Sequence, residues 1–252
     1  PIKSSAASDV YKRQDKDCYV DFDRIFAVSD ETAGVLAGVY PECQQKLSVF
    51  HNLIDTEAIR QKALLPAEKS MHEGIRLLTV GRLTPQKGFD CAVYALKLLL
   101  EKQYPVYWYI IGEGPEYGRL TQLARSLHVE DHFIFLGMQT NPYPYFKMAD
   151  FYIHATRFEG KSIAIQEAQV LGCAIAASDC SGNREQIVSG VDGLLCPFSP
   201  EGIANAVEYL IEHPQTAQSF GRAAAQKACH FENDIHMIRD LLYSPCLLYT
   251  SD

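Results

Sequence analysis

Two carboxylates in the stretch R-F-E-G-K-S-I-A-I-Q-E-A, residues 157–168, have the spacing in this sequence that most suggests chemistry. Glu159 is expected in a loop, and Glu167 more than one turn into the helix that follows, so they cannot act together as acid and base on one reacting atom. Carboxylates accept hydrogen bonds from hydroxyl groups. The pair therefore suits the two ends of an elongated ligand. The alternative interpretation is that Glu167 is an ordinary surface residue of the helix and that Glu159 is a charge at the start of that helix.

The residues around this pair predict an anion site. Ser162 is expected to cap a helix beginning near Ile163, where the helix dipole favours negative charge. The loop G-R-L-T-P-Q-K-G-F, residues 81–89, supplies Arg82 and Lys87 at another helix start, which suits phosphate. A diphosphate with a hydroxyl-bearing group on either side, as in a nucleotide sugar, fits both loops. Ordinary surface charges on a solvated loop are the alternative.

The elements that position these loops are short apolar runs alternating with helical segments. Runs rich in β-branched and aromatic residues predict strands, and because they are apolar on both faces they indicate a mostly parallel sheet covered on both sides. The fold class is therefore α/β, with a Rossmann-like, doubly wound sheet. Ligands bind beyond the carboxyl ends of such strands, so the loops after residues 81, 112, 137 and 155 are the places to look for a site. The predicted strands are 24–29, 46–52, 75–81, 106–112, 132–137, 150–155, 174–178 and 193–197, with helices at 31–40 and from Asp55 to about Lys69.

Two other features near these loops carry weaker signals. The loop G-E-G-P-E-Y-G, residues 112–118, lacks the third glycine of a dinucleotide fingerprint because Tyr117 stands there; a turn with a helix start at Pro115 fits better. His154 ends the strand before the two-glutamate motif. It is either a satisfied core histidine or a residue lining the pocket, and we favour the core.

Composition narrows the class of protein. With 47% hydrophobic residues in 252, the chain is expected to be globular. Its 31 acidic against 23 basic residues argue against a nucleic-acid binder. Eight cysteines without a C-x-x-C pair suggest reduced thiols, and no apolar run approaches the roughly 18 residues of a membrane span. No signal peptide is recognisable, so we expect a cytoplasmic protein.

The order and spacing of the motifs over about residues 20–240 carry a family resemblance. The segments G-R-L-T-P-Q-K-G-F, I-I-G-E-G-P-E-Y-G-R-L and R-F-E-G-K-S-I-A-I-Q-E-A resemble the C-terminal domain of GT-B glycosyltransferases of the retaining family four, the glycosyl transferases group 1. The resemblance implies that Glu159 contacts the hydroxyls of a donor sugar and that Glu167 contacts the nucleotide ribose. Arg82 and Lys87 match the basic pair that binds the donor diphosphate.

The resemblance also implies further donor contacts and a mechanism. The backbone from Gly160 to Ile163 matches the loop that holds the distal phosphate and sugar, and Gly81 and Met138 fall in matching donor-side loops. Lys161 departs from the commoner E-G-F or E-G-L; we favour a solvent-facing side chain over a phosphate contact. The implied reaction is retaining sugar transfer from a nucleoside diphosphate sugar, with no metal required. The D-x-D patterns at 15–17 and 21–23 are interpreted as chance. Asn183 and Arg184 replace a more usual glycine pair.

The ends of the chain suggest a fragment. Residues 1–15 and 244–252 resemble translated adapter sequence, 16–54 are interpreted as the end of an N-terminal acceptor domain with its hinge, and 55–243 as the donor-binding domain. A glycan or lipid-linked acceptor is expected, with no nucleic-acid partner; the full-length protein could associate peripherally with the inner face of a membrane. A sugar-nucleotide epimerase or phosphorylase, a Rossmann-type dehydrogenase and a non-catalytic binding module are the alternatives.

Overall fold

The computed structural model describes residue 19 and residues 21–229, which divide into two compact units. The first contains the described residues up to Asn52, and the second begins at Leu53. The expected adapter-like tails, 1–15 and 244–252, and residues 230–243 of the expected donor-binding domain lie outside the described residues. The assignment of the two parts to acceptor and donor domains stays a prediction.

The first unit is a short β-α-β segment. Strands β1 (Ile25–Ala27) and β2 (Leu47–Val49) pair in parallel, and helix α2 (Asp30–Val39) and the 3-10 helix η1 (Pro41–Lys46) connect them. Ser29 caps α2 by accepting a hydrogen bond from the backbone of Thr32. The predicted strand, helix and strand are confirmed here; the two strands are shorter than predicted, and the helix begins and ends one residue earlier.

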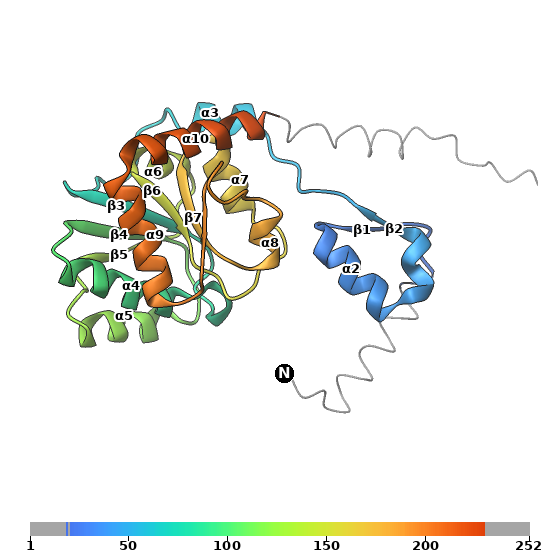
Figure 1. The fold of residues 1–252 in the computed structure, drawn as a ribbon, viewed down its shortest axis with the longest axis horizontal. Helices are drawn as coiled ribbons and strands as arrows, with labels where there is room; N and C mark the ends of the chain where they lie inside the picture. Colours follow the sequence, from blue (N-terminus) through green and yellow to red (C-terminus); the bar gives the residue numbers. More distant parts are fainter. Residues whose placement is uncertain (1–18, 20, 230–252) are drawn as a thin grey trace, which may run out of the picture. The chain divides into compact units, whose positions relative to one another are not determined.

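The second unit is built on a six-stranded parallel sheet in the order β5-β4-β3-β6-β7-β8 (Figure 1). This confirms the α/β, doubly wound fold class. The order reverses between β3 and β6, which lie side by side although they are not consecutive, so their carboxyl ends form the switch point where such sheets bind ligands. The strands are β3 (Ile75–Val80), β4 (Val106–Ile111), β5 (Phe133–Gly137), β6 (Phe151–His154), β7 (Ala174–Ser178) and β8 (Leu194–Cys196).

Helices cover both faces of this sheet because alternate residues of each strand point to opposite sides. Leu77 belongs to the core shared with α4, α5 and α9, whereas the next residue, Leu78, belongs to the core shared with α6 and α7. The helices of this unit are α3 (Thr56–Lys62), η2 (Pro85–Lys87), α4 (Phe89–Glu101), α5 (Tyr117–Ser126), α6 (Tyr143–Met148), α7 (Ile163–Val170), α8 (Ser181–Arg184), α9 (Pro200–Glu212) and α10 (Pro214–Ala228).

Two helix bounds differ from the sequence prediction. Helix α3 ends at Lys62 instead of near Lys69, because the ring of Pro66 would clash with the carbonyl of Lys62 if the helix continued. That carbonyl instead accepts a hydrogen bond from Asn141. Helix α5 begins at Tyr117, and Pro115 lies in the turn before it.

The six cysteines in the described part of the chain are all free, and four of them are buried. No helix within residues 21–229 is both long and apolar enough to cross a membrane.

Candidate functional site

The loops that follow β3 and β6 meet around one cavity of about 430 Å³ at the switch point. Five of the residues predicted to form the site line it: Gly81, Arg82, Lys87, Glu159 and Ser162. They come from positions up to 81 apart in the sequence. The fold therefore gathers the two cations, one carboxylate and the start of α7 at a single place.

Close backbone contacts fix the shape of the loop after β3. Gly88 has a left-handed φ of 63°, and a Cβ there would lie 2.7 Å from the carbonyl oxygen of Ala155. Gly112, with φ of 140°, lies against the backbone of Gly81, and Gly114 lies against that of Leu83. The glycines of the 112–118 loop thus allow two chain segments to approach each other.

Hydrogen bonds join the two loops directly. The backbone carbonyl of Gln86 accepts from the Thr156 hydroxyl at 3.1 Å and from the Arg157 amide at 2.9 Å. The Gln86 side chain donates to the carbonyl of Phe158 at 3.0 Å. Arg157 also forms a two-pronged ion pair with Asp90 at the start of α4, at 3.0 and 2.7 Å. Lys87 and Glu159 are therefore held on a connected scaffold.

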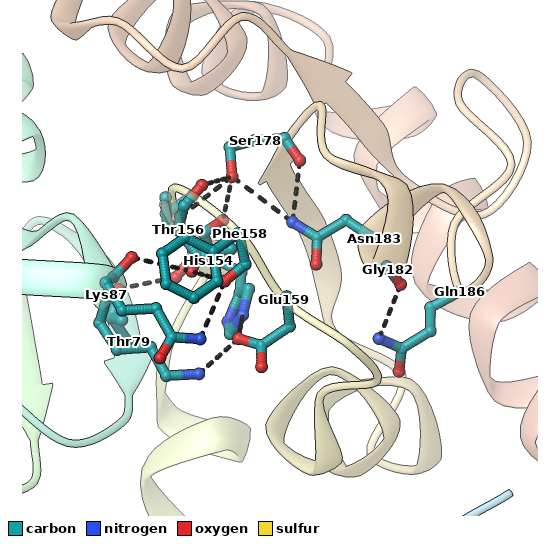
Figure 2. Close-up of polar contacts among 12 residues, drawn as sticks. Thr79, Lys87, His154, Thr156, Phe158, Glu159, Ser178, Gly182, Asn183 and Gln186 are labelled. Atoms are coloured by element: carbon teal, nitrogen blue, oxygen red, sulfur yellow. Dashed lines mark hydrogen bonds and ion pairs between the residues drawn. The ribbon is translucent and has the colours of Figure 1, made fainter. Parts of the chain in front are cut away.

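Glu159 uses one oxygen for contacts within the protein. Its Oε2 accepts hydrogen bonds from Lys87 Nζ and, at 3.2 Å, from His154 Nε2 (Figure 2). No hydrogen bond to Oε1 occurs within the described residues. Burial opposes ionisation of this carboxyl group, but the hydrogen bonds from His154 and Lys87 outweigh burial and lower its pKa below the ordinary 4.5. The ionised carboxylate can thus offer Oε1 to a ligand hydroxyl.

The two cations keep donors for an anion. The exposed Arg82 side chain makes no hydrogen bond or ion pair with any described residue. Lys87 is half-buried and packs its stem over Gly81, and its ammonium carries three N–H donors, of which the contact with Glu159 uses one. Positive charge is therefore available on one side of the cavity.

The start of α7 also lines this cavity, but Ser162 does not cap it as predicted. Ser162 occupies the N-cap position, yet its hydroxyl makes no capping hydrogen bond; the buried side chain lines the cavity instead of folding back over the helix. The amides of the first turn therefore have no side-chain cap, and they suit an anion. The loop at Glu159 and Gly160 rests on Gly182, where a Cβ would lie 2.0 Å from the carbonyl oxygen of Gly160.

Glu167 is half-buried and lies beyond the lining of the 430 Å³ cavity. Its Oε1 accepts a hydrogen bond from the Tyr143 hydroxyl at 3.0 Å. Burial raises the pKa of Glu167, although the hydrogen bond from Tyr143 opposes the change. Burial and the charge of Glu167 raise the pKa of Tyr143 to about 12. The ribose contact predicted for Glu167 stays a prediction.

The other predicted donor-binding residues lie around the two loops and the next strand. Met138 is 71% exposed and follows Gly137, which lines a second cavity, of about 510 Å³, at the carboxyl ends of β4 and β5. Ile163 is exposed at the first position of α7, and Lys161 is half-buried rather than fully in solvent.

Sequence reasoning missed the partners that hold the site residues. Gln86 and Thr156 join the loops, and Tyr143 holds Glu167. His154 has both ring nitrogens satisfied and is 2% exposed, as the favoured core interpretation requires. No spacing signal could have revealed these contacts, because most of them join residues more than 20 positions apart.

Comparison with known proteins identifies the class. Residues 60–227 match the sequence profile described as glycosyl transferases group 1. This chain therefore belongs to that family of glycosyltransferases.

Individual relatives agree with this assignment. A Campylobacter jejuni protein named N-acetylgalactosamine-N,N'-diacetylbacillosaminyl-diphospho-undecaprenol 4-alpha-N-acetylgalactosaminyltransferase is 30% identical over 200 residues, covering 79% of this chain and 53% of the relative. Glycogen synthase of Mycobacterium tuberculosis is 30% identical over 189 residues, covering 72% of this chain and 44% of the relative. The chain spans about half the length of the curated relatives it matches.

Solved structures support the fold. The crystal structure of Anabaena Alr3699/HepE in complex with UDP-glucose superimposes with a TM-score of 0.82 at 20% identity, covering 94% of this chain and 68% of that one. WaaG, a glycosyltransferase involved in lipopolysaccharide biosynthesis, superimposes with a TM-score of 0.75 at 16% identity, covering 95% and 68%. The likeness confirms the GT-B fold expected from the sequence.

Proposed function

We propose that this chain is the donor-binding half of a retaining glycosyltransferase that moves a sugar from a nucleoside diphosphate sugar to a glycan or lipid-linked acceptor. One observation carries the proposal. Arg82, Lys87, Glu159 and the uncapped start of α7 face a single cavity at the switch point of the sheet. Cations and backbone amides suit a diphosphate, and a carboxylate beside them suits a sugar hydroxyl.

The proposed mode of binding assigns each group a part. The diphosphate lies between the two cations and the first turn of α7, and Glu159 accepts a hydroxyl of the donor sugar through Oε1. Glu167, held by Tyr143, accepts a ribose hydroxyl. Gly160 and Lys161 supply the loop beside the distal phosphate, and Met138 lies on the nucleoside side.

The proposed chemistry is stabilisation of charge on a leaving group. As the bond from the anomeric carbon to the diphosphate breaks, negative charge grows on the departing nucleoside diphosphate. Arg82, Lys87 and the α7 amides stabilise that charge more in the transition state than in the bound donor. This arrangement requires no metal, and that expectation remains part of the proposal.

The comparisons support the donor and acceptor classes. Alr3699/HepE was crystallised with UDP-glucose, and the names of the relatives include a diphospho-undecaprenol acceptor and glycogen. By analogy we propose a cytoplasmic location for the full-length protein, with peripheral association at the inner face of a membrane if the acceptor is lipid-linked.

Calorimetric titration tests the proposal. UDP, GDP and ADP, each alone and as the glucose conjugate, are titrated into the chain, and at least one should bind. Arg82→Ala should weaken that binding at least about tenfold, as expected for a lost charge-assisted hydrogen bond. Arg125→Ala, on the exposed last turn of α5, is the matched control and should bind like the wild type. Absence of binding, or equal losses in both variants, would contradict the proposal.

The chain on its own is expected to bind donor without transferring sugar, because it spans about half the length of its relatives. Incubation with radiolabelled UDP-glucose and mixed glycan or lipid acceptors should give no labelled glycoside. Measurable transfer by the purified chain would show that this expectation is wrong.

A further inference from the structure

A buried chain of polar groups runs from the cavity into the core. Lys87 contacts Glu159, and Glu159 accepts a hydrogen bond from Nε2 of His154 (Figure 2). Nδ1 of His154 in turn contacts the Tyr152 hydroxyl at 3.2 Å. His154 is 2% exposed and Tyr152 is fully buried. Both point to the same face of β6, since they are two residues apart on one strand. Neither lines the cavity, so neither is placed to touch a ligand.

The positions of the protons on Glu159, His154 and Tyr152 follow from which of their atoms can donate and which can accept hydrogen bonds. An ionised Glu159 only accepts, so Nε2 of His154 must carry a hydrogen. A neutral imidazole has one N–H, which makes Nδ1 an acceptor and the Tyr152 hydroxyl its donor. Burial, assisted by the nearby charge of Lys87, lowers the pKa of His154 despite the opposing effect of Glu159, which agrees with a neutral ring.

Two side chains donate hydrogen bonds to Glu159, and a bound nucleotide sugar would affect them differently. Lys87 is a flexible cation facing the cavity, so a diphosphate would attract its ammonium away from the carboxylate. His154 is neutral and enclosed by the core, so a phosphate exerts no comparable pull on it. The hydrogen bond from His154 to Glu159 therefore persists when the Lys87 ammonium is shared between Glu159 and a bound diphosphate.

We propose that the Tyr152–His154 pair is a positioning device that holds Oε2 of Glu159, so that Oε1 stays aimed at a hydroxyl of the donor sugar. This inference rests on the proposed function. It predicts that the pair affects the sugar part of the donor's affinity and leaves the nucleoside diphosphate part unchanged.

The test compares two affinities for each variant. The best-bound nucleotide of the screen described above is titrated with and without its glucose, and the ratio of the two dissociation constants measures the gain from the sugar. His154→Leu removes the N–H that donates to Glu159 and replaces the ring with an apolar side chain of similar size. It should reduce the gain from the sugar about tenfold and leave the affinity for the bare nucleotide unchanged. His154→Gln keeps an N–H near the position of Nε2 and should restore most of the gain.

Two tyrosine variants form a matched pair. Tyr152→Phe, which loosens His154, should lower the gain from the sugar. Tyr143→Phe, which removes the hydroxyl that holds Glu167, should weaken the bare nucleotide instead. A purely structural role for His154 would lower both affinities together, or leave His154→Gln as impaired as His154→Leu, and either result would overturn the inference.

A measurement without ligand checks the arrangement itself. Nitrogen-15 spectra of the histidine rings at neutral pH should show His154 neutral with its proton on Nε2; a charged ring or an Nδ1 proton would overturn the inference. If no nucleotide binds the wild type, the proposed function and this inference both fail. If nucleotide binds and depends on Arg82, but His154→Leu leaves the gain from the sugar unchanged, only this inference fails.

Discussion

Replacing Lys87 by methionine should destabilise the unit that holds the site. The side chains of Lys87 and Glu159 are only 21% and 12% exposed, so the variant leaves a carboxylate largely buried with one remaining donor, His154. Removing one partner of a fully buried ion pair costs about 3–5 kcal/mol. Partial exposure and the retained hydrogen bond from His154 reduce the expected loss in free energy of unfolding to about 2 kcal/mol.

A second substitution separates stability from binding. Adding Glu159→Gln to Lys87→Met removes the stranded charge, so the double variant should regain most of the lost stability, to within about 1 kcal/mol of the wild type. It should not regain nucleotide affinity, because the cation that faces the diphosphate is still missing.

Trp108 provides the assay. It is the single tryptophan of the sequence and is fully buried in the same unit as the site, so its fluorescence during urea unfolding reports on that unit. Nucleotide affinity is measured on the same samples by calorimetry. Two results would refute the ion pair as the cause of the loss. One is an unchanged free energy of unfolding in Lys87→Met, and the other is a double variant whose loss equals the sum of the losses in the two single variants.

Three further predictions use other parts of the site. Glu167→Ala should weaken nucleotide binding by roughly tenfold, and an undiminished thermal shift on adding nucleotide would count against its role. Gly88→Ala should cost at least about 1–3 kcal/mol, because φ is 63° and a Cβ would meet the carbonyl of Ala155. Gly118→Ala, in α5 with nothing within 4 Å, is its control and should be neutral or slightly stabilising; equal effects would show that the contact at Gly88 is unimportant. Because folding lowers the pKa of Glu159, its ionised form stabilises the native state above pH 4.5, and this contribution is lost as the pH falls through the lowered pKa. The stability difference between wild type and Glu159→Gln should therefore shrink in urea titrations well below pH 4.5, and a constant difference would argue against the shift.

The strands were predictable because their residue types indicate both that the segment is a strand and that the strand is buried. The runs at 75–81, 106–112 and 174–178 were expected within a residue of their observed ends. Continuous apolar runs are typical of strands buried on both faces. The expected helix after Asp55 was too long because its polar pattern was followed past Pro66, which stops a helix.

The place of the site was predictable, but its internal contacts were not. Parallel strands direct attention to the loops at their carboxyl ends, and Arg82, Lys87 and Glu159 do lie together there. The ion pair between Lys87 and Glu159 joins residues 72 positions apart, and sequence spacing carries no information about such a contact. The capping role expected for Ser162 failed for a similar reason, since only the packed loops show that its side chain is buried in the cavity wall.

A crystal structure of the chain with a bound nucleoside diphosphate sugar would show whether the cavity between the loops after β3 and β6 holds the diphosphate. We expect the diphosphate to lie between Arg82, Lys87 and the first turn of α7, with Glu159 on a sugar hydroxyl and Glu167 on the ribose. A diphosphate bound outside this cavity, or one with neither cation within hydrogen-bond distance, would contradict this expectation.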